Sequence, residues 1–199
     1  MSFRPFRPRS PDSVYSEASI ITVVRVAASL TFFALAIHYR NPTYNYIGFV
    51  VHWLVDAVDG FCARRFKQET ILGAEFDLIA DRIEIVCFYM IFLHFHPGLL
   101  LPAMLYLVDY AVVDFYLGFQ FSKFGIISPD YYYKVNRTVY RLNFSPAGKF
   151  ANSSVVTLAL VFLPGLRMVV AAYALGLIVV KSYSVYLVER EKVKLRSMH

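Results

Sequence analysis

Six apolar runs alternate with shorter polar segments along the chain. They lie at residues 20–38, 46–58, 78–94, 99–121, 155–163 and 168–187. A helix needs about 20 residues to cross the hydrocarbon core of a bilayer, so the chain has room for roughly six crossings. His-Pro-Gly at 96–98 and Pro-Gly at 164–165 predict tight turns, which would pair neighbouring runs as helical hairpins. The pattern therefore predicts an all-α integral membrane protein with six transmembrane helices.

The composition agrees with membrane insertion. Hydrophobic residues make up 58% of the chain and charged residues 17%, and the mean hydropathy is +0.51. Soluble domains carry about 25% charged and about 45–50% apolar residues. These values argue against disorder, nucleic-acid binding and a disulfide scaffold. Cys62 and Cys87 lie in or beside apolar runs, and we expect both to be structural.

The distribution of basic residues predicts the topology. Most Lys and Arg residues fall on one side of the six runs, whereas Arg40 and Arg167 fall on the other. Because basic residues stay on the cytoplasmic side, both termini are expected there. We divide the chain into a juxtamembrane segment (1–18), a six-helix domain (19–188) and a basic cytoplasmic tail (189–199). Small size and the lack of a targeting extension favour the cytoplasmic membrane of a prokaryote.

Seven acidic residues lie within or at the ends of the apolar runs. They are Asp56, Asp59, Asp77, Asp81, Glu84, Asp109 and Asp114. An acid at the centre of a bilayer helix costs roughly 2.5–3.5 kcal/mol, so such residues usually serve a function. Asp56 and Asp59 are three residues apart and share a helix face. Asp77 and Asp81, four apart, do the same on the next helix, and the short basic loop between these helices brings all four together.

Such a cluster requires cations, because neighbouring carboxylates cannot all stay ionised alone. An all-oxygen ligand set suits Mg²⁺ or Mn²⁺, and we expect two ions. Gly60, Ala63 and Gly73 leave space for a ligand to approach the backbone. Arg64, one turn after Gly60, offers a fork of donors to a phosphate. Metals, an arginine and space for a ligand together indicate phosphoryl chemistry.

Eight positions around this cluster resemble the signature of the CDP-alcohol phosphatidyltransferases. They are arranged as Asp56-x2-Asp59-Gly60-x2-Ala63-Arg64-x8-Gly73-x3-Asp77-x3-Asp81. The segment Ile20-Ile-Thr22-Val-Val-Arg25 is similar to the L-T-x-x-R element that opens the first span in many members. Six spans also agree with the family fold.

The resemblance implies transfer of a phosphatidyl group from CDP-diacylglycerol to an alcohol, with release of CMP, by a homodimer at the cytoplasmic face. It implies that two divalent metal ions are held by Asp56, Asp59, Asp77 and Asp81. In this scheme Asp81 is also the catalytic base that takes the proton of the attacking hydroxyl. Contacts with the cytidine diphosphate part of the lipid are implied for Gly60, Ala63, Arg64 and Gly73.

The acceptor is predicted from the region between the fourth and fifth runs. Basic residues gather there, at Lys123, Lys134, Arg137, Arg141 and Lys149. They suit an acceptor that carries phosphate, or anionic lipid headgroups. Asp109 and Asp114 are five apart and are not expected to share a face, so Asp114 could bind acceptor hydroxyls while Asp109 pairs with a basic residue. The loop 122–144 is long and rich in tyrosine, and Tyr131, Tyr132 and Tyr133 fit interfacial anchoring.

The segment 147–153 resembles the G-K-x-x-T element of the glycerophosphate and cardiolipin branches, with Asn152 at the Thr position. It favours glycerol 3-phosphate or phosphatidylglycerol as acceptor. Those branches often have Arg before the acid of the fourth span, where this chain has Val108 before Asp109. Inositol phosphate is therefore kept as the alternative.

Other interpretations remain for individual residues. The acids could form ion pairs with Arg64, Arg65 and Arg82 while glycines pack helices, or they could line the path of an ion-conducting protein. A lipid-binding scaffold without activity is a further alternative, although every motif carboxylate is present. Glu84 is expected to partner Arg82 or the metals. Interfacial positions are expected for His38, His52, His94 and His96.

Overall fold

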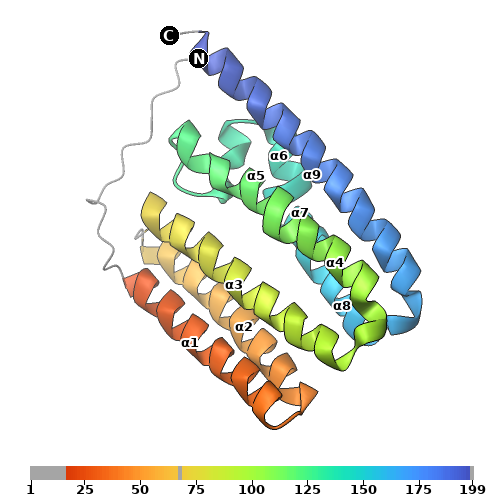
Figure 1. Cartoon of the computed structure of the whole chain (residues 1–199). Coiled ribbons are helices and arrows are strands. Elements are labelled where there is room, and N and C mark those ends of the chain that lie inside the picture. Colours follow the sequence, from red (N-terminus) through yellow and green to blue (C-terminus); the bar gives the residue numbers. More distant parts are fainter. Residues whose placement is uncertain (1–16, 67–68, 198–199) are drawn as a thin grey trace. The chain divides into compact units, whose positions relative to one another are not determined.

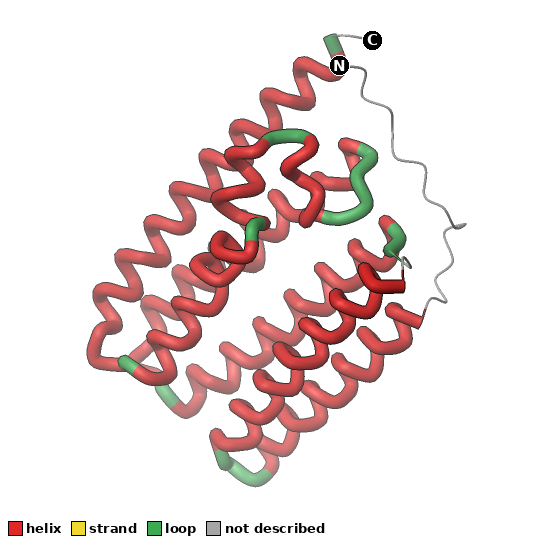
Figure 2. The backbone as a smooth tube through the Cα atoms, turned by 180° about the vertical axis from the view of Figure 1, so that it is seen from behind, coloured by secondary structure: helices red, strands yellow, loops and turns green. Residues whose placement is uncertain are grey.

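The computed structural model describes residues 17–66 and 69–197, which form helices joined by short turns (Figure 2). No strand occurs in these ranges, so the all-α prediction is confirmed. Three helical stretches are long and apolar enough to cross a membrane, namely Ile20–His38, Pro97–Phe124 and Pro164–Leu195. Six spans and the side of the termini stay predictions, and the proposed juxtamembrane segment lies almost wholly outside the described residues.

The chain divides into two compact units, one of residues 8–98 and one built mainly of residues 99–199. In the first unit three long helices pack side by side (Figure 1). They are α1 (Glu17–His38), α2 (Pro42–Phe66) and α3 (Ile71–Phe95). Helices α2 and α3 extend beyond the apolar runs that predicted them, because they also contain the polar residues of the aspartate motif.

A tight reversal joins α1 to α2. Arg40 has a φ of 49°, and the N–H of Asn41 donates to the carbonyl oxygen of Ala36 at 3.1 Å, which closes the last turn of α1. The side chain of Asn41 then accepts from the N–H of Thr43 at 2.9 Å. Pro42 is the first residue of α2, where its missing N–H has no helical partner to lose. The two helices therefore lie antiparallel.

The buried stripe of α1 follows helical spacing and changes from polar to apolar along its length. It consists of Thr22, Arg25, Ser29, Phe33 and Ala36. The apolar end packs through aromatic contacts, with the ring centroids of Phe88 and Phe49 4.5 Å apart and those of Phe88 and Phe33 6.4 Å apart. The first unit therefore has an aromatic core at one end and a charged cluster at the other.

The second unit contains one long helix interrupted by other helical geometries, then a series of short helices and a final long helix. Its α-helices are α4 (Leu100–Val108), α5 (Phe115–Phe119), α6 (Arg137–Val139), α7 (Pro146–Lys149), α8 (Val155–Phe162) and α9 (Arg167–Arg196). Three π-helical turns lie at Asp109–Asp114, Tyr140–Phe144 and Phe150–Ser154. The two expected tight turns are short 3-10 helices, Pro97–Leu99 and Pro164–Leu166.

The tyrosine-rich segment is not the open loop that its composition suggested. It contains 3-10 helices at Gln120–Phe124 and Pro129–Lys134. Tyr132 is fully buried, donates its hydroxyl to the carbonyl oxygen of Leu117 at 3.0 Å, and stacks on Phe144 with ring centroids 4.7 Å apart. Burial raises the pKa of its phenol. The interfacial expectation is therefore wrong for Tyr132, which belongs to the core.

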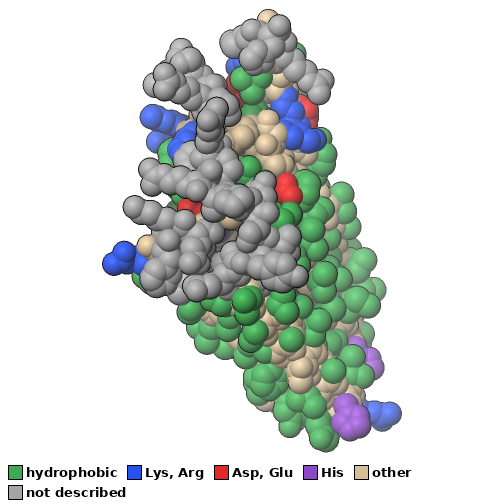
Figure 3. Space-filling model, turned by 90° about the vertical axis from the view of Figure 1, so that its left-hand side faces the viewer, with side chains coloured by type: hydrophobic (Ala, Val, Ile, Leu, Met, Phe, Trp, Pro, Cys, Tyr) green, Lys and Arg blue, Asp and Glu red, His purple; other side chains and the backbone are tan. Residues whose placement is uncertain are grey.

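Much of the molecular surface is apolar. Hydrophobic side chains cover most of the described part of the face shown in Figure 3. In the first unit, exposed apolar side chains occur on all three helices, for example Val24, Leu54 and Met90. Extended apolar surface of this kind marks an interaction site, and on long apolar helices a lipid environment accounts for it.

Gly48 of α2 allows a close approach to α1. A Cβ atom built on Gly48 would lie 2.6 Å from a ring carbon of Phe33, so a larger residue must displace a buried aromatic side chain. We expect Gly48→Ala to reduce stability by about 1–3 kcal/mol, measured as a lower melting temperature in detergent. The control is Gly176→Ala on α9, where a Cβ meets nothing within 4 Å. An equal change of melting temperature in both variants would contradict the view that Gly48 is needed for the close approach of α1 and α2.

Candidate active site

An acidic cluster lies at the polar end of the first unit. Asp56 on α2 and Asp77 and Asp81 on α3 each offer a carboxylate oxygen, and these oxygens lie within 4.8 Å of one another. The three side chains are partly exposed, at 38%, 40% and 22% respectively. Helical spacing places Asp77 one turn before Asp81, and the packing of α2 against α3 adds Asp56.

The cation among these aspartates is Arg25 of α1. Its side chain is fully buried, and its Nη2 atom lies 2.7 Å from Oδ1 of Asp81 and 3.0 Å from Oδ1 of Asp77. Its Nη1 atom donates to Oδ1 of Asp56. The sequence suggested Arg64, Arg65 or Arg82 as partners, but Arg65 is exposed. No role in the site was predicted for Arg25 from the sequence. A signal was present, because Arg25 is the only Lys or Arg in the first apolar run and an isolated charge within a membrane span indicates a charged partner.

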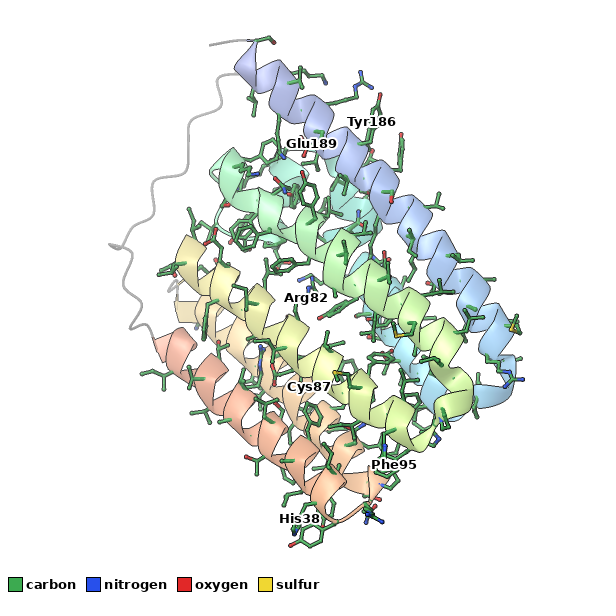
Figure 4. The ribbon with its side chains drawn as sticks, in the orientation of Figure 1. His38, Arg82, Cys87, Phe95, Tyr186 and Glu189 are labelled. Atoms are coloured by element: carbon green, nitrogen blue, oxygen red, sulfur yellow. The ribbon has the colours of Figure 1, made fainter. Side chains whose placement is uncertain are left out.

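Glu84 connects the cluster to the interior of the unit. Its carboxylate is fully buried, with Oε2 lying 3.2 Å from Nε of Arg25 and 3.1 Å from Nδ1 of His52. The hydroxyl of Ser29 donates to its other oxygen. The interfacial position expected for His52 is therefore wrong, whereas His38, at the end of α1 in Figure 4, is exposed.

Gly73 has a local structural role at the start of α3. Its N–H donates to the side-chain oxygen of Thr70 at 3.0 Å, which caps the helix. A Cβ on Gly73 would lie 2.8 Å from that oxygen. Gly60 is half-buried on α2. The side chains of Asp59, Ala63 and Arg64 are not among the described ones. The metal-binding role of Asp59 and the ligand contacts of Gly60, Ala63, Arg64 and Gly73 therefore stay predictions.

The donor set fits divalent cations. Three aspartates and Glu84 surround Arg25, and the charge of Arg82 also acts on Asp81. Among these side chains negative charge is in excess even if His52 is protonated. Hard divalent ions such as Mg²⁺ and Mn²⁺ prefer carboxylate oxygens. The partly exposed aspartate side chains are accessible to such ions, whereas the fully buried Glu84 is not.

The second unit contains another buried ion cluster. Nζ of Lys181 on α9 lies 2.7 Å from Oδ2 of Asp109 and 3.1 Å from Oδ1 of Asp114. The expectation that these aspartates do not share a face is wrong, because they are the first and last residues of a π-helical turn. In such a turn the backbone hydrogen bonds join residues five apart, so the side chains of Asp109 and Asp114 lie close enough to reach the same lysine.

The basic residues proposed for acceptor binding are all exposed or partly exposed. They are Lys134, Arg137, Arg141 and Lys149, with Lys123 nearby. Nζ of Lys149 lies 2.5 Å from Oδ1 of Asp130, and Nζ of Lys134 lies 4.6 Å from the ring centroid of Tyr131. Arg137 and Arg141 are four residues apart, and neither forms an ion pair within the described ranges.

Two residues of the segment 147–153, Gly148 and Asn152, have a packing role. A Cβ on Gly148 would lie 2.9 Å from the carbonyl oxygens of Arg141 and Leu142. Asn152 is buried and donates to the carbonyl oxygen of Leu142 at 3.0 Å. This carbonyl lies in a π-helical turn, which alters the normal helical bonding. Gly148 and Asn152 therefore hold two adjacent turns together.

Comparison with known proteins identifies the family. The model of the family described as CDP-alcohol phosphatidyltransferase matches residues 16–187. A probable CDP-diacylglycerol–inositol 3-phosphatidyltransferase 2 of Arabidopsis thaliana is 31% identical over 88 residues, which are 44% of this chain and 38% of that protein. A CDP-diacylglycerol–inositol 3-phosphatidyltransferase 1 of the same plant gives the same identity and coverage.

A bacterial relative matches as well. The CDP-diacylglycerol–glycerol-3-phosphate 3-phosphatidyltransferase of Cereibacter sphaeroides is 30% identical over 99 residues, which are 47% of this chain and 45% of that protein. The matched segments thus span less than half of each of these relatives. No solved structure matches the chain.

Lys181 is expected to be essential for the stability of the second unit. Lys181→Met removes a cation buried against Asp109 and Asp114, and loss of one partner of a buried pair costs about 3–5 kcal/mol. We expect a large fall in melting temperature in detergent. The matched control is Lys194→Met, since Lys194 is exposed and pairs with Glu191 on the same helix, where about 0–1 kcal/mol is expected. Comparable small effects in both variants would contradict the expectation.

Proposed function

The chain belongs to the CDP-alcohol phosphatidyltransferase family, and we propose that it transfers a phosphatidyl group from CDP-diacylglycerol to the hydroxyl of an alcohol. The observation that carries this proposal is the convergence of Asp56, Asp77 and Asp81, whose carboxylate oxygens lie within 4.8 Å of one another. The reaction forms a bond between the acceptor oxygen and the phosphorus of the lipid, and it breaks the bond to CMP, which leaves.

We propose that two Mg²⁺ or Mn²⁺ ions are held by Asp56, Asp59, Asp77 and Asp81. When bound, such ions neutralise charge on the pyrophosphate and on the leaving CMP. Asp81 has the least exposed side chain of the three described aspartates, at 22%, and is proposed to accept the proton of the attacking hydroxyl. Gly60, Ala63, Arg64 and Gly73 are proposed to contact the cytidine diphosphate group.

The lipid donor accounts for the placement of this chemistry on apolar helices. A diacylglycerol tail remains in the bilayer, so the reacting phosphorus stays near the membrane surface. We propose a multi-pass enzyme of the cytoplasmic membrane that works as a homodimer with its site at the cytoplasmic face. An ion-conducting protein is less well supported, because Asp56, Asp77 and Asp81 gather at one end of the first unit whereas its other end is an aromatic core.

For the acceptor we propose glycerol 3-phosphate or phosphatidylglycerol, with inositol phosphate as the alternative. The bacterial relative is named for glycerol 3-phosphate and the two plant relatives for inositol. Arg137 and Arg141 are the best candidates for a phosphate group of the acceptor, because both are accessible guanidinium groups one turn apart. Lys134, Lys149 and Asp114 are weaker candidates, since each already contacts a neighbouring side chain.

The first experiment is CMP release by the purified protein with CDP-diacylglycerol and Mn²⁺ or Mg²⁺. Glycerol 3-phosphate, phosphatidylglycerol, inositol phosphate and inositol are offered separately, and the lipid products are identified by mass. Metal-dependent CMP release with one acceptor is the expected result. Folded protein that releases no CMP with any acceptor would overturn the proposed donor or the proposed activity.

Asp81→Asn is expected to reduce CMP release at least about a hundredfold, because removal of a general base costs this much or more. The amide keeps the size of the side chain, so a melting temperature close to that of the wild type is expected in EDTA. Loss of activity together with loss of the fold would not count in favour of the role. Normal turnover in the variant would exclude Asp81 as the base.

Arg141→Gln is expected to raise the KM for a phosphate-bearing acceptor about tenfold or more, because a hydrogen bond to a charged group is worth about 1.5–3 kcal/mol. The KM for CDP-diacylglycerol should stay unchanged. Lys194→Gln serves as a control, since Lys194 is an exposed basic residue near the end of α9. Equal effects on both substrates would place Arg141 in general lipid contact instead of acceptor binding.

A further inference from the structure

The contacts of Arg25 follow one pattern. The guanidinium contacts one carboxylate oxygen on each of Asp56, Asp77 and Asp81. A guanidinium has five N–H donors in one rigid plane, so a single group can fix several carboxylates at once. A carboxylate has two oxygen atoms, and contact of one oxygen with Arg25 is compatible with metal coordination by the other.

Glu84 forms an ion pair with this guanidinium at its Nε atom, without the geometry of a hydrogen bond. Its Oε2 atom lies 3.2 Å from Nε of Arg25, whereas the aspartates contact the two Nη atoms. Glu84 is itself held by the hydroxyl of Ser29 on α1 and by Nδ1 of His52 on α2. Every helix of the first unit therefore contributes to a buried network behind the aspartates, and Arg25 and Glu84 are inaccessible to water.

A contribution to stability alone does not explain why these helices use buried charges. A buried ion network is often no more stable than apolar residues of the same size. It does provide orientation, because a carboxylate that binds a metal is usually held by an outer hydrogen bond, and loss of that bond lowers metal affinity about 10–100-fold. Without Arg25, repulsion among the aspartates would also separate their oxygens.

We propose that Arg25 is a positioning residue for the metal site, and that Glu84 anchors it. Arg25 holds the three aspartates at the spacing that a divalent ion requires, and Glu84, Ser29 and His52 fix the direction in which its Nη atoms point. This inference rests on the proposed function, because it requires that the aspartates bind divalent ions.

The test measures binding of Mn²⁺ to the full-length protein in detergent. The concentration of free Mn²⁺ is determined from its electron paramagnetic resonance signal. Arg25→Lys keeps the charge but loses the planar fork, and we expect its Kd for Mn²⁺ to rise about 10–100-fold. Glu84→Gln keeps Arg25 and every aspartate, and a smaller rise of several-fold is expected. Thr31→Val is the matched control on α1, because Thr31 is exposed and its hydroxyl donates to the carbonyl oxygen of Ala27.

A second measurement separates positioning from catalysis. High Mn²⁺ should restore much of the CMP release of Arg25→Lys, because saturation compensates for weaker binding. The same treatment should not restore Asp81→Asn, which lacks the proposed base. A purely structural role of Arg25 would lower the melting temperature and leave the Kd of the folded protein unchanged.

The outcomes distinguish the two proposals. An unchanged Kd for Mn²⁺ in folded Arg25→Lys or in folded Glu84→Gln would overturn the positioning role and leave the metal site intact. If Arg25→Lys does not fold, the Kd values of Glu84→Gln and Ser29→Ala for Mn²⁺ test the positioning role, since both variants preserve all aspartates and the guanidinium. Wild-type protein that binds no Mn²⁺ would overturn the proposed function itself.

Discussion

The contact between the guanidinium of Arg25 and its acidic neighbours is the interaction on which the first unit depends. Four carboxylates close together among apolar helices repel one another and lose hydration. A fully buried cation offsets both costs, and it does so from a different helix than the acids. The ion pairs therefore determine how α1 must lie against α2 and α3. The second unit uses the same principle, with Lys181 between Asp109 and Asp114.

Packing and chemistry occupy opposite ends of the same three helices. The aromatic rings of Phe33, Phe49 and Phe88 fill one end, and the close approach at Gly48 keeps α1 and α2 together there. The charged end has no comparable apolar core among the described residues and is held by ion pairs and hydrogen bonds. A tightly packed end gives the aspartates a fixed base, which a metal site needs because its ligands must keep their spacing.

Sequence reasoning was accurate where a single helix decides the geometry. The spacing of Asp77 and Asp81 predicted a shared face, and the apolar runs predicted where the long helices lie. It also predicted that Asp56 of α2 meets Asp77 and Asp81 of α3, because a short loop joins these helices. It failed for contacts between helices that the aspartate motif does not include. The partner of the aspartates, Arg25, and the buried position of His52 both belong to this class.

A second kind of failure came from the assumption that every helix is regular. A π-helical turn contains one residue more than an α-helical turn, so it rotates the helix after the turn by roughly 100° relative to the helix before it. The pairing of Asp109 and Asp114 with Lys181 therefore depends on the number of residues between them as well as on their types. Loss of one residue within 110–113 would place the two acids four positions apart, a spacing that shares one face of a regular α-helix. The π-helical turn therefore accommodates one additional residue in this helix while both acids stay within reach of Lys181.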